Sequence, residues 1–186
     1  GALFLFGAVQ VTMITVGVVR GERPLSHDWL GLTVATAGLV WLTVPGAAAP
    51  DVWGALLMVV AGICWGAYSI AGRTSRDPLA ATAGNFVRAT VLGAVALGAL
   101  VAPDQITTNG VLLAAASGAI ASGIGYTVWY SALPALAAWR AALVQLPVPV
   151  LTALAAVVFL GESITMRLLI ATALVCGGIG MSMLGT

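Results

Sequence analysis

A few polar side chains inside long hydrophobic stretches are the residues of this chain that could do chemistry. Arg88 lies about ten residues into the hydrophobic segment 79–101, roughly 13 Å from the start of a helix that rises 1.5 Å per residue. A charge at that depth of a membrane faces a cavity or a partner, or its long side chain reaches back to the interface. Asn85, one turn earlier, is expected on the same face. An anionic substrate group and the lipid headgroups are therefore the two alternatives for Arg88.

Two prolines, Pro147 and Pro149, interrupt the hydrophobic segment 140–160. A proline cannot donate a backbone hydrogen bond, so the carbonyls of Leu143 and Gln145 are expected to be free near the bilayer interior. Free carbonyls at that depth must line a cavity or be buried in protein. Together with the Gln145 side chain they could bind a polar substrate, and a packing kink closed by a neighbouring helix is the alternative.

The first hydrophobic segment, residues 1–19, carries its own polar residues at Gln10, Thr12 and Thr15. Gln10 is a second candidate for substrate contact. The alternative for all three is hydrogen bonding between helices, which contributes about 1 kcal/mol in a membrane.

Aromatic residues recur at positions that could form the wall of a pocket. Tyr126 follows Gly118 and Ser122 at intervals of four residues and so shares a helical face with them, whereas Trp129 falls on an adjoining stripe. Trp65 and Tyr68 lie in an earlier hydrophobic segment. Such rings could stack on apolar or cationic parts of a substrate, and anchoring at the membrane interface is the alternative.

Catalytic and metal-binding chemistry is not indicated. The hydrophobic segments contain no aspartate, glutamate or histidine, so no nucleophile and base pair or metal-ligand set can be assembled inside them. Cys64 and Cys176 each stand alone within a hydrophobic segment, where a cysteine most often serves as a small packing residue. We therefore expect no catalytic residue, no metal, no cofactor and no enzymatic activity.

Long hydrophobic helices must position these residues. Of the 186 residues, 61% are hydrophobic and 7% are charged, which is typical of a chain dissolved in lipid. Lipid offers the backbone no hydrogen-bond partners, so we expect an all-α polytopic bundle. The net charge of +1 provides no basic surface for nucleic acid. Seven transmembrane helices are predicted, at Gly1–Val19, Trp29–Val44, Val52–Gly72, Leu79–Val101, Gly110–Leu133, Arg140–Leu160 and Met166–Leu184.

The arginines indicate how the chain is oriented. Five of them lie in or beside the connectors that follow the first, third and fifth predicted helices, which share one side of the membrane. Arg167 is the one arginine beside a connector on the opposite side. Because positively charged connectors stay in the cytoplasm, we expect a multi-pass protein of the inner cell membrane with a cytoplasmic C-terminus. The five arginines are Arg20, Arg23, Arg73, Arg76 and Arg140.

A shift of 140 residues relates the beginning of the chain to its end. It carries Gly21-Glu22 onto Gly161-Glu162 and Thr12 onto Thr152. The shift crosses five predicted helices, an odd number, so related helices should cross the membrane in opposite directions, as in the inverted repeats of secondary transporters. A pair of five-helix units needs ten helices, and we expect the other three before Gly1. The alternative is that two helical hairpins with Gly-Glu turns look alike by chance.

The chain resembles the EamA family of the drug/metabolite transporter superfamily over nearly all its length. Ala171 departs from the pattern, which has glycine there. The motifs that carry the resemblance are Arg20-Gly21-Glu22-Arg23-Pro24 with Gly31 and Gly38, Gly62-Ile-Cys-Trp65-Gly66-Ala-Tyr68, Gly123-Ile-Gly-Tyr-Thr-Val-Trp129-Tyr-Ser-Ala-Leu, Arg140-Ala-Ala-Leu-Val-Gln145-Leu-Pro147-Val-Pro149-Val and Phe159-Leu-Gly161-Glu162.

The resemblance implies a ten-helix inverted-repeat transporter that works by alternating access. Residues 1–46 would end the first repeat and residues 52–186 would form the second. It implies export or exchange of small organic metabolites such as amino acids, with a small-molecule substrate and the lipid bilayer as partners. Association with further copies of the chain is an open alternative, and so is a channel-like or structural membrane subunit without saturable transport.

Overall fold

The structure, a computed structural model, describes residues 2–44, 51–102 and 106–184, and these residues are helical with no strands. The α-helices are α1 Ala2–Val19, α2 Ser26–Thr43, α3 Val52–Arg73, α4 Pro78–Leu100, α5 Thr108–Ala116, α6 Gly125–Ala132, α7 Ala138–Val144, α8 Val148–Leu160 and α9 Met166–Leu184. A π-helix, η2 Ser117–Ile124, joins α5 to α6, and a 3-10 helix, η3 Leu133–Ala135, follows α6. The expected repeat boundary at residue 46 lies outside the described residues.

Six helical segments in the described ranges are long and apolar enough to cross a membrane. They correspond to six of the seven predicted helices, and α9 has the predicted bounds. The segment missing from the six is α2, which begins three residues earlier than predicted and so includes the polar residues Ser26, His27 and Asp28. An all-helical, multi-pass membrane protein is therefore confirmed.

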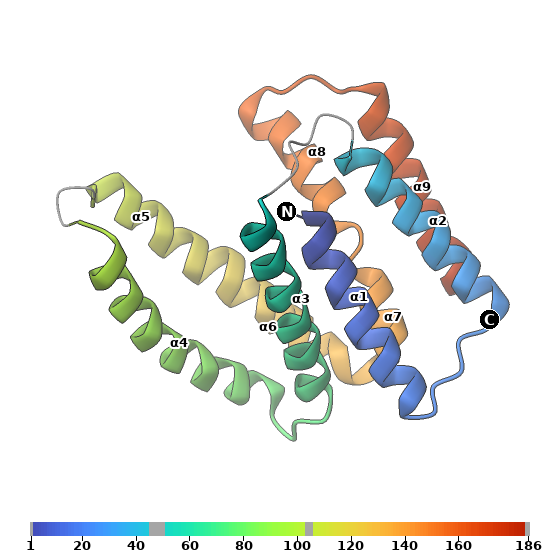
Figure 1. The fold of residues 1–186 in the computed structure, drawn as a ribbon, viewed down its shortest axis with the longest axis horizontal. Coiled ribbons are helices and arrows are strands. Elements are labelled where there is room, and N and C mark those ends of the chain that lie inside the picture. The colour runs from blue at the N-terminus through green and yellow to red at the C-terminus, as the bar shows by residue number, and fades with distance from the viewer. Residues whose placement is uncertain (1, 45–50, 103–105, 185–186) are drawn as a thin grey trace. The chain divides into compact units, whose positions relative to one another are not determined.

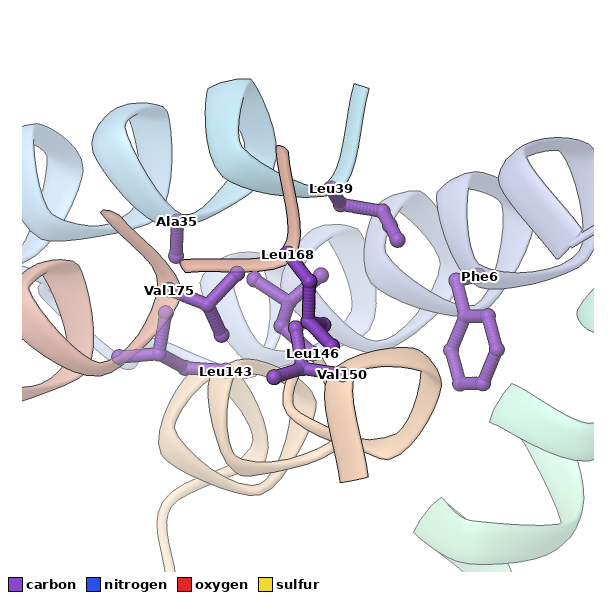
Figure 2. Packing of buried hydrophobic residues seen from close by; sticks show 8 residues of the cluster. All are labelled: Phe6, Ala35, Leu39, Leu143, Leu146, Val150, Leu168 and Val175. Atoms are coloured by element: carbon purple, nitrogen blue, oxygen red, sulfur yellow. The ribbon is translucent and has the colours of Figure 1, made fainter. Parts of the chain in front are cut away.

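The helices form two compact units, which we describe separately. The first consists of Gly1–Tyr68 and Ala137–Thr186, and the second of Ser69–Leu136. In the core of the first unit, Leu143, Leu146 and Val150 from the α7–α8 segment gather with residues of α2 and α9 (Figure 2). The remaining buried members of this cluster are Phe6, Ala35, Leu39, Leu168 and Val175.

Within this unit, α2 and α9 pack side by side along their lengths (Figure 1). Gly31 lies against the backbone of Gly178, and Gly38 lies against Leu174, Val175 and the carbonyl of Ala171. The order of these contacts shows that the two helices are antiparallel. Under the 140-residue shift, Gly31 corresponds to Ala171 and Gly38 to Gly178, so each contact is the image of the other. Small residues at both places let the backbones approach closely.

Two further local features recur at the same shift. Gly21 and Gly161 both have positive φ, 91° and 68°, a conformation that glycine adopts without steric cost. Thr12 donates to the carbonyl of Ala8 at 2.7 Å, and Thr152 donates to that of Val148 at 2.8 Å. These threonines therefore bond within their own helices and do not bridge two helices.

The α3 helix approaches α1 through two glycines. A Cβ on Gly62 would meet the carbonyl oxygen of Leu5. A Cβ on Gly66 would lie 2.9 Å from the Cβ of Thr12. Gly62 and Gly66 therefore let the two backbones approach closely. The middle of α3 thereby packs against Leu5, Ala8 and Thr12 of α1.

The prolines divide the predicted helix 140–160 into α7 and α8. The prediction that the carbonyls of Leu143 and Gln145 are free is wrong. The carbonyl of Leu143 accepts from the amide of Leu146 at 3.1 Å, and that of Gln145 accepts from Val148 at 3.2 Å. The chain tightens into i→i+3 bonds at the break, which is how a helix end commonly pairs carbonyls that have lost their i+4 donors. The carbonyls of Leu143 and Gln145 are therefore already paired within the chain.

In the second unit, α4 packs against α6. The predicted helix 110–133 is divided, because its middle third is the π-helix η2. A π turn closes i→i+5 bonds and changes the angular register. Gly118 and Ser122 lie within η2, so the predicted four-residue stripe keeps α-helical spacing only from Tyr126 onward.

Candidate functional site: two buried amides beside a cavity

The site is centred on two glutamines that come from different helices of the first unit. Gln10 of α1 is 7% exposed and Gln145, which follows α7, is 4% exposed. The Nε2 of Gln10 donates to the carbonyl of Ala142 at 2.7 Å, and the Nε2 of Gln145 donates to the carbonyl of Ala141 at 3.2 Å. Both amides are thus held by consecutive carbonyls of α7.

Met13 lies against the Gln145 amide. It lies one turn after Gln10 on α1, is fully buried, and its Sδ is 3.2 Å from Nε2 of Gln145. Neither amide oxygen has a hydrogen-bond partner: Oε1 of Gln10 and Oε1 of Gln145 are both buried and unpaired. A buried acceptor without a donor costs about 1–3 kcal/mol, so such groups usually mark a place for water or a ligand.

A cavity of about 390 Å³ lies beside Gln10. Its walls come mainly from α1 and α2, with Leu146 at the α7–α8 break, and its polar lining residues are Gln10, Thr15 and Thr36. Ligand pockets typically measure about 300–1,000 Å³ and combine apolar walls with a few polar groups. The cavity therefore has the size and composition of a site for a small molecule.

Trp65 and Tyr68 of α3 belong to the same unit. The ring of Trp65 lies 5.7 Å from that of Phe6 on α1, and its Nε1 is buried without a hydrogen-bond partner. Tyr68 is half-buried. Neither residue lines the 390 Å³ cavity.

The other four candidates lie in the second unit. Arg88 donates to the side-chain oxygen of Asn85 at 3.2 Å, so the two are neighbours as predicted, and both are exposed on α4. Tyr126 meets Phe86 edge-on at 5.3 Å and stacks on Tyr130 at 5.8 Å. Trp129, half-buried on α6, has an unpaired Nε1. The structure thus gathers the candidates into two groups, with Gln10, Gln145, Trp65 and Tyr68 in the first unit.

Sequence reasoning missed a buried carboxylate, Asp28. It is 4% exposed and accepts from the amide of Leu25 at 2.7 Å and from the hydroxyl of Ser182 at 2.8 Å. The Nε2 of His27 lies 3.3 Å from Oδ1 of Asp28. Asp28 closes the first turn of α2 and ties it to α9. An acidic residue at the third position of a helix could have indicated this cap.

Glu22 caps the start of α7. Its Oε1 accepts from the amide of Ala138 at 2.9 Å, and its Oε2 accepts from the amide of Trp139 at 3.3 Å. These amides open α7 and have no partners within the helix, so the carboxylate pairs them and interacts favourably with the helix dipole. Glu22 therefore fixes the helix whose carbonyls hold Gln10 and Gln145.

The model of the EamA-like transporter family matches residues 52–184. A solved crystal structure, described only as that of a protein, superposes with a TM-score of 0.85 at 24% identity, covering 100% of this chain and 68% of the other. At that identity the superposition shows a shared fold and nothing more.

Two curated relatives are similar over most of this chain. An uncharacterized protein of Pseudomonas aeruginosa is 50% identical over 97% of the chain and 63% of its own length. The threonine/homoserine exporter RhtA of Salmonella typhimurium is 26% identical over 91% of the chain and 59% of its own length. The chain thus spans about three fifths of the length of these relatives.

Proposed function

Because this chain belongs to the EamA-like transporter family, we propose that it forms part of an inner-membrane secondary transporter that exports or exchanges small organic metabolites by alternating access. The family match and the similarity to an exporter support a membrane transporter.

The observation that supports a substrate site most directly is the cavity beside Gln10. It has walls that are mainly apolar, it holds a buried side chain with an unpaired acceptor, and it reaches the break between α7 and α8 at Leu146. Broken helices are a recurring element of transporter sites, because their ends supply polar groups inside the membrane. We assign Gln10 and Gln145 to the site on this basis. Substrate binding by Trp65, Tyr68, Asn85, Arg88, Tyr126 and Trp129 is proposed from the sequence alone.

The antiparallel pair of α2 and α9 supports an inverted repeat. These two helices correspond under the 140-residue shift, and their glycine contacts are images of each other. We propose a ten-helix protein of two five-helix repeats, in which three helices precede α1. The greater length of the relatives agrees with this proposal.

The orientation follows from the arginines at alternate connectors, which we place in the cytoplasm together with the C-terminus. For the substrate we propose amino acids or related compounds, since one relative is named as an exporter of threonine and homoserine. The apolar walls and the small number of polar groups in the cavity suit a compact solute of this kind.

Counterflow in proteoliposomes tests the function. The full-length protein is reconstituted, the vesicles are loaded with unlabelled L-threonine or L-homoserine, and uptake of the labelled compound is followed. We expect transient accumulation that saturates with concentration, because a carrier exchanges solute through a site that is occupied once per cycle. Flux that rises linearly with concentration, or a conductance without saturation, would contradict the proposal and favour a channel.

A further inference from the structure

The packing of α3 on α1 predicts a further contact on α8. Gly62 lies against Leu5 and Ala8 of α1. One turn later on α3, Gly66 lies against Thr12. In an inverted repeat, a contact between two helices has an image between the two helices related to them. The 140-residue shift carries α1 onto the α7–α8 segment, so the image of this contact places another helix against α8.

Thr152 of α8 is exposed, although its equivalent on α1, Thr12, is half-buried. Both hydroxyls donate to the carbonyl four residues earlier, so the two side chains bond alike. They differ in what covers them. A Cβ on Gly66 would lie 2.9 Å from the Cβ of Thr12, whereas Thr152 is exposed within the part of the chain that the structure describes. One turn before Thr152, Val148 is 41% exposed, and its equivalent, Ala8, is half-buried.

Resting on the inverted repeat of the proposed function, we propose that the face of α8 formed by Val148 and Thr152 is the docking site of the first of the three helices that precede α1. That helix is the counterpart of α3 in the first repeat. The length of the relatives agrees with this occupant, because the chain covers 63% and 59% of them. The remainder is on the order of 100 residues, which is room for three spans of about 20 residues with their connectors.

The geometry of α3 on α1 indicates what the docking helix presents to α8. At Gly66 a Cβ would already be closer to Thr12 than side chains normally pack, and a threonine stands again at Thr152. Val148 is larger than its counterpart on α1. We therefore expect small residues, with glycine first among them, at the positions 140 residues before Gly62 and Gly66. Small residues spaced by four let two membrane helices approach closely.

Disulfide cross-linking in the full-length protein tests the contact. Cys64 and Cys176 are replaced by alanine, and Thr152→Cys is combined with a cysteine at the position 140 residues before Gly66. A disulfide needs Cα atoms about 4.4–6.8 Å apart. Val158→Cys with the same upstream cysteine is the control, because Val158 is 74% exposed on α8. It lies about 9 Å further along the axis than Thr152 and on the opposite face of the helix.

We expect oxidation to cross-link the Thr152→Cys pair and to leave the Val158→Cys pair reduced, as measured by mass spectrometry of the linked peptides. A second comparison uses Thr152→Trp and Val158→Trp. An indole fits among lipid chains but not beneath a closely packed helix, so Thr152→Trp should lower the melting temperature in detergent and Val158→Trp should not. This comparison decides the question if the cysteine pair does not fold.

The absence of a cross-link in the folded Thr152→Cys pair would overturn the docking site and assign this face of α8 to lipid. Where the pair does not fold, equal melting temperatures of the two tryptophan variants would overturn it. Counterflow of L-threonine by the wild-type protein is measured separately. If counterflow saturates and no cross-link forms, the transport function stands without this docking site. If the cross-link forms and counterflow is absent, the docking site stands and the transport function fails.

Discussion

Gly31 and Gly178 face each other so closely that a Cβ on either would meet the carbonyl oxygen of the other. The two residues lie 147 positions apart in the chain, on antiparallel helices α2 and α9. Backbone cannot move aside as a flexible side chain can, so this contact requires glycine on both helices.

Gly178→Ala should therefore destabilise the protein by about 1–3 kcal/mol, the usual effect of forcing extra atoms into a packed interface. Gly177→Ala is the matched control on the same helix, because a Cβ there meets nothing within 4 Å. Melting temperatures of the two variants in detergent provide the comparison. Equal shifts in both would show that α2 and α9 do not pack in this way.

Glu22→Ala should loosen the start of α7, because the amides of Ala138 and Trp139 lose their acceptor. Losing a helix cap costs about 0.5–2 kcal/mol, so hydrogen exchange at these amides should accelerate. Glu162→Ala, at the related and exposed turn, is the control and should leave exchange in α7 unchanged. The capping role fails if both variants exchange alike.

Arg23→Cys and Ser163→Cys should react from opposite sides of the membrane, because the proposed inverted repeat makes α2 a fifth membrane-crossing helix between these turns, in addition to the four spans that lie there. The two positions are 140 residues apart, and both are exposed. The measurement is labelling in intact cells with an impermeant thiol reagent, after Cys64 and Cys176 have been replaced by alanine. We expect Ser163→Cys to react and Arg23→Cys to be protected until the cells are opened. Equal labelling of both would contradict the inverted repeat.

Arg88→Ala should weaken substrate binding about ten- to a hundredfold if the guanidinium pairs with an anionic group of the substrate. Arg88→Lys should restore only part of the affinity, because an ammonium lacks the planar fork of donors. Binding to the purified full-length protein is the measurement, with the melting temperature as a control for folding. Unchanged affinity in folded Arg88→Ala would assign this arginine to the headgroup interface and remove it from the site.

Much of the helical architecture is determined by local sequence. In lipid a backbone must pair its own hydrogen bonds, so a long run without charges becomes a helix whatever surrounds it. For that reason α9 begins and ends where predicted. Pro147 divides α7 from α8 because a proline has no amide hydrogen to continue the helix. The Gly-Glu turns were also predicted from sequence, and positive φ at Gly21 and Gly161 agrees with a turn that needs glycine.

Tertiary structure decided the partners of the polar groups. The break at Pro147 closes with i→i+3 bonds, so the unpaired acceptors are the side-chain oxygens of Gln10 and Gln145 and not the backbone carbonyls of the break. Asp28 is buried because Ser182 reaches it from α9. These outcomes depend on contacts between residues that lie far apart in the chain. Gln10 and Ala142 are separated by 132 positions, and Asp28 and Ser182 by 154. Hydrophobic periodicity describes one helix at a time, and it contains no information about which helix will supply the donor.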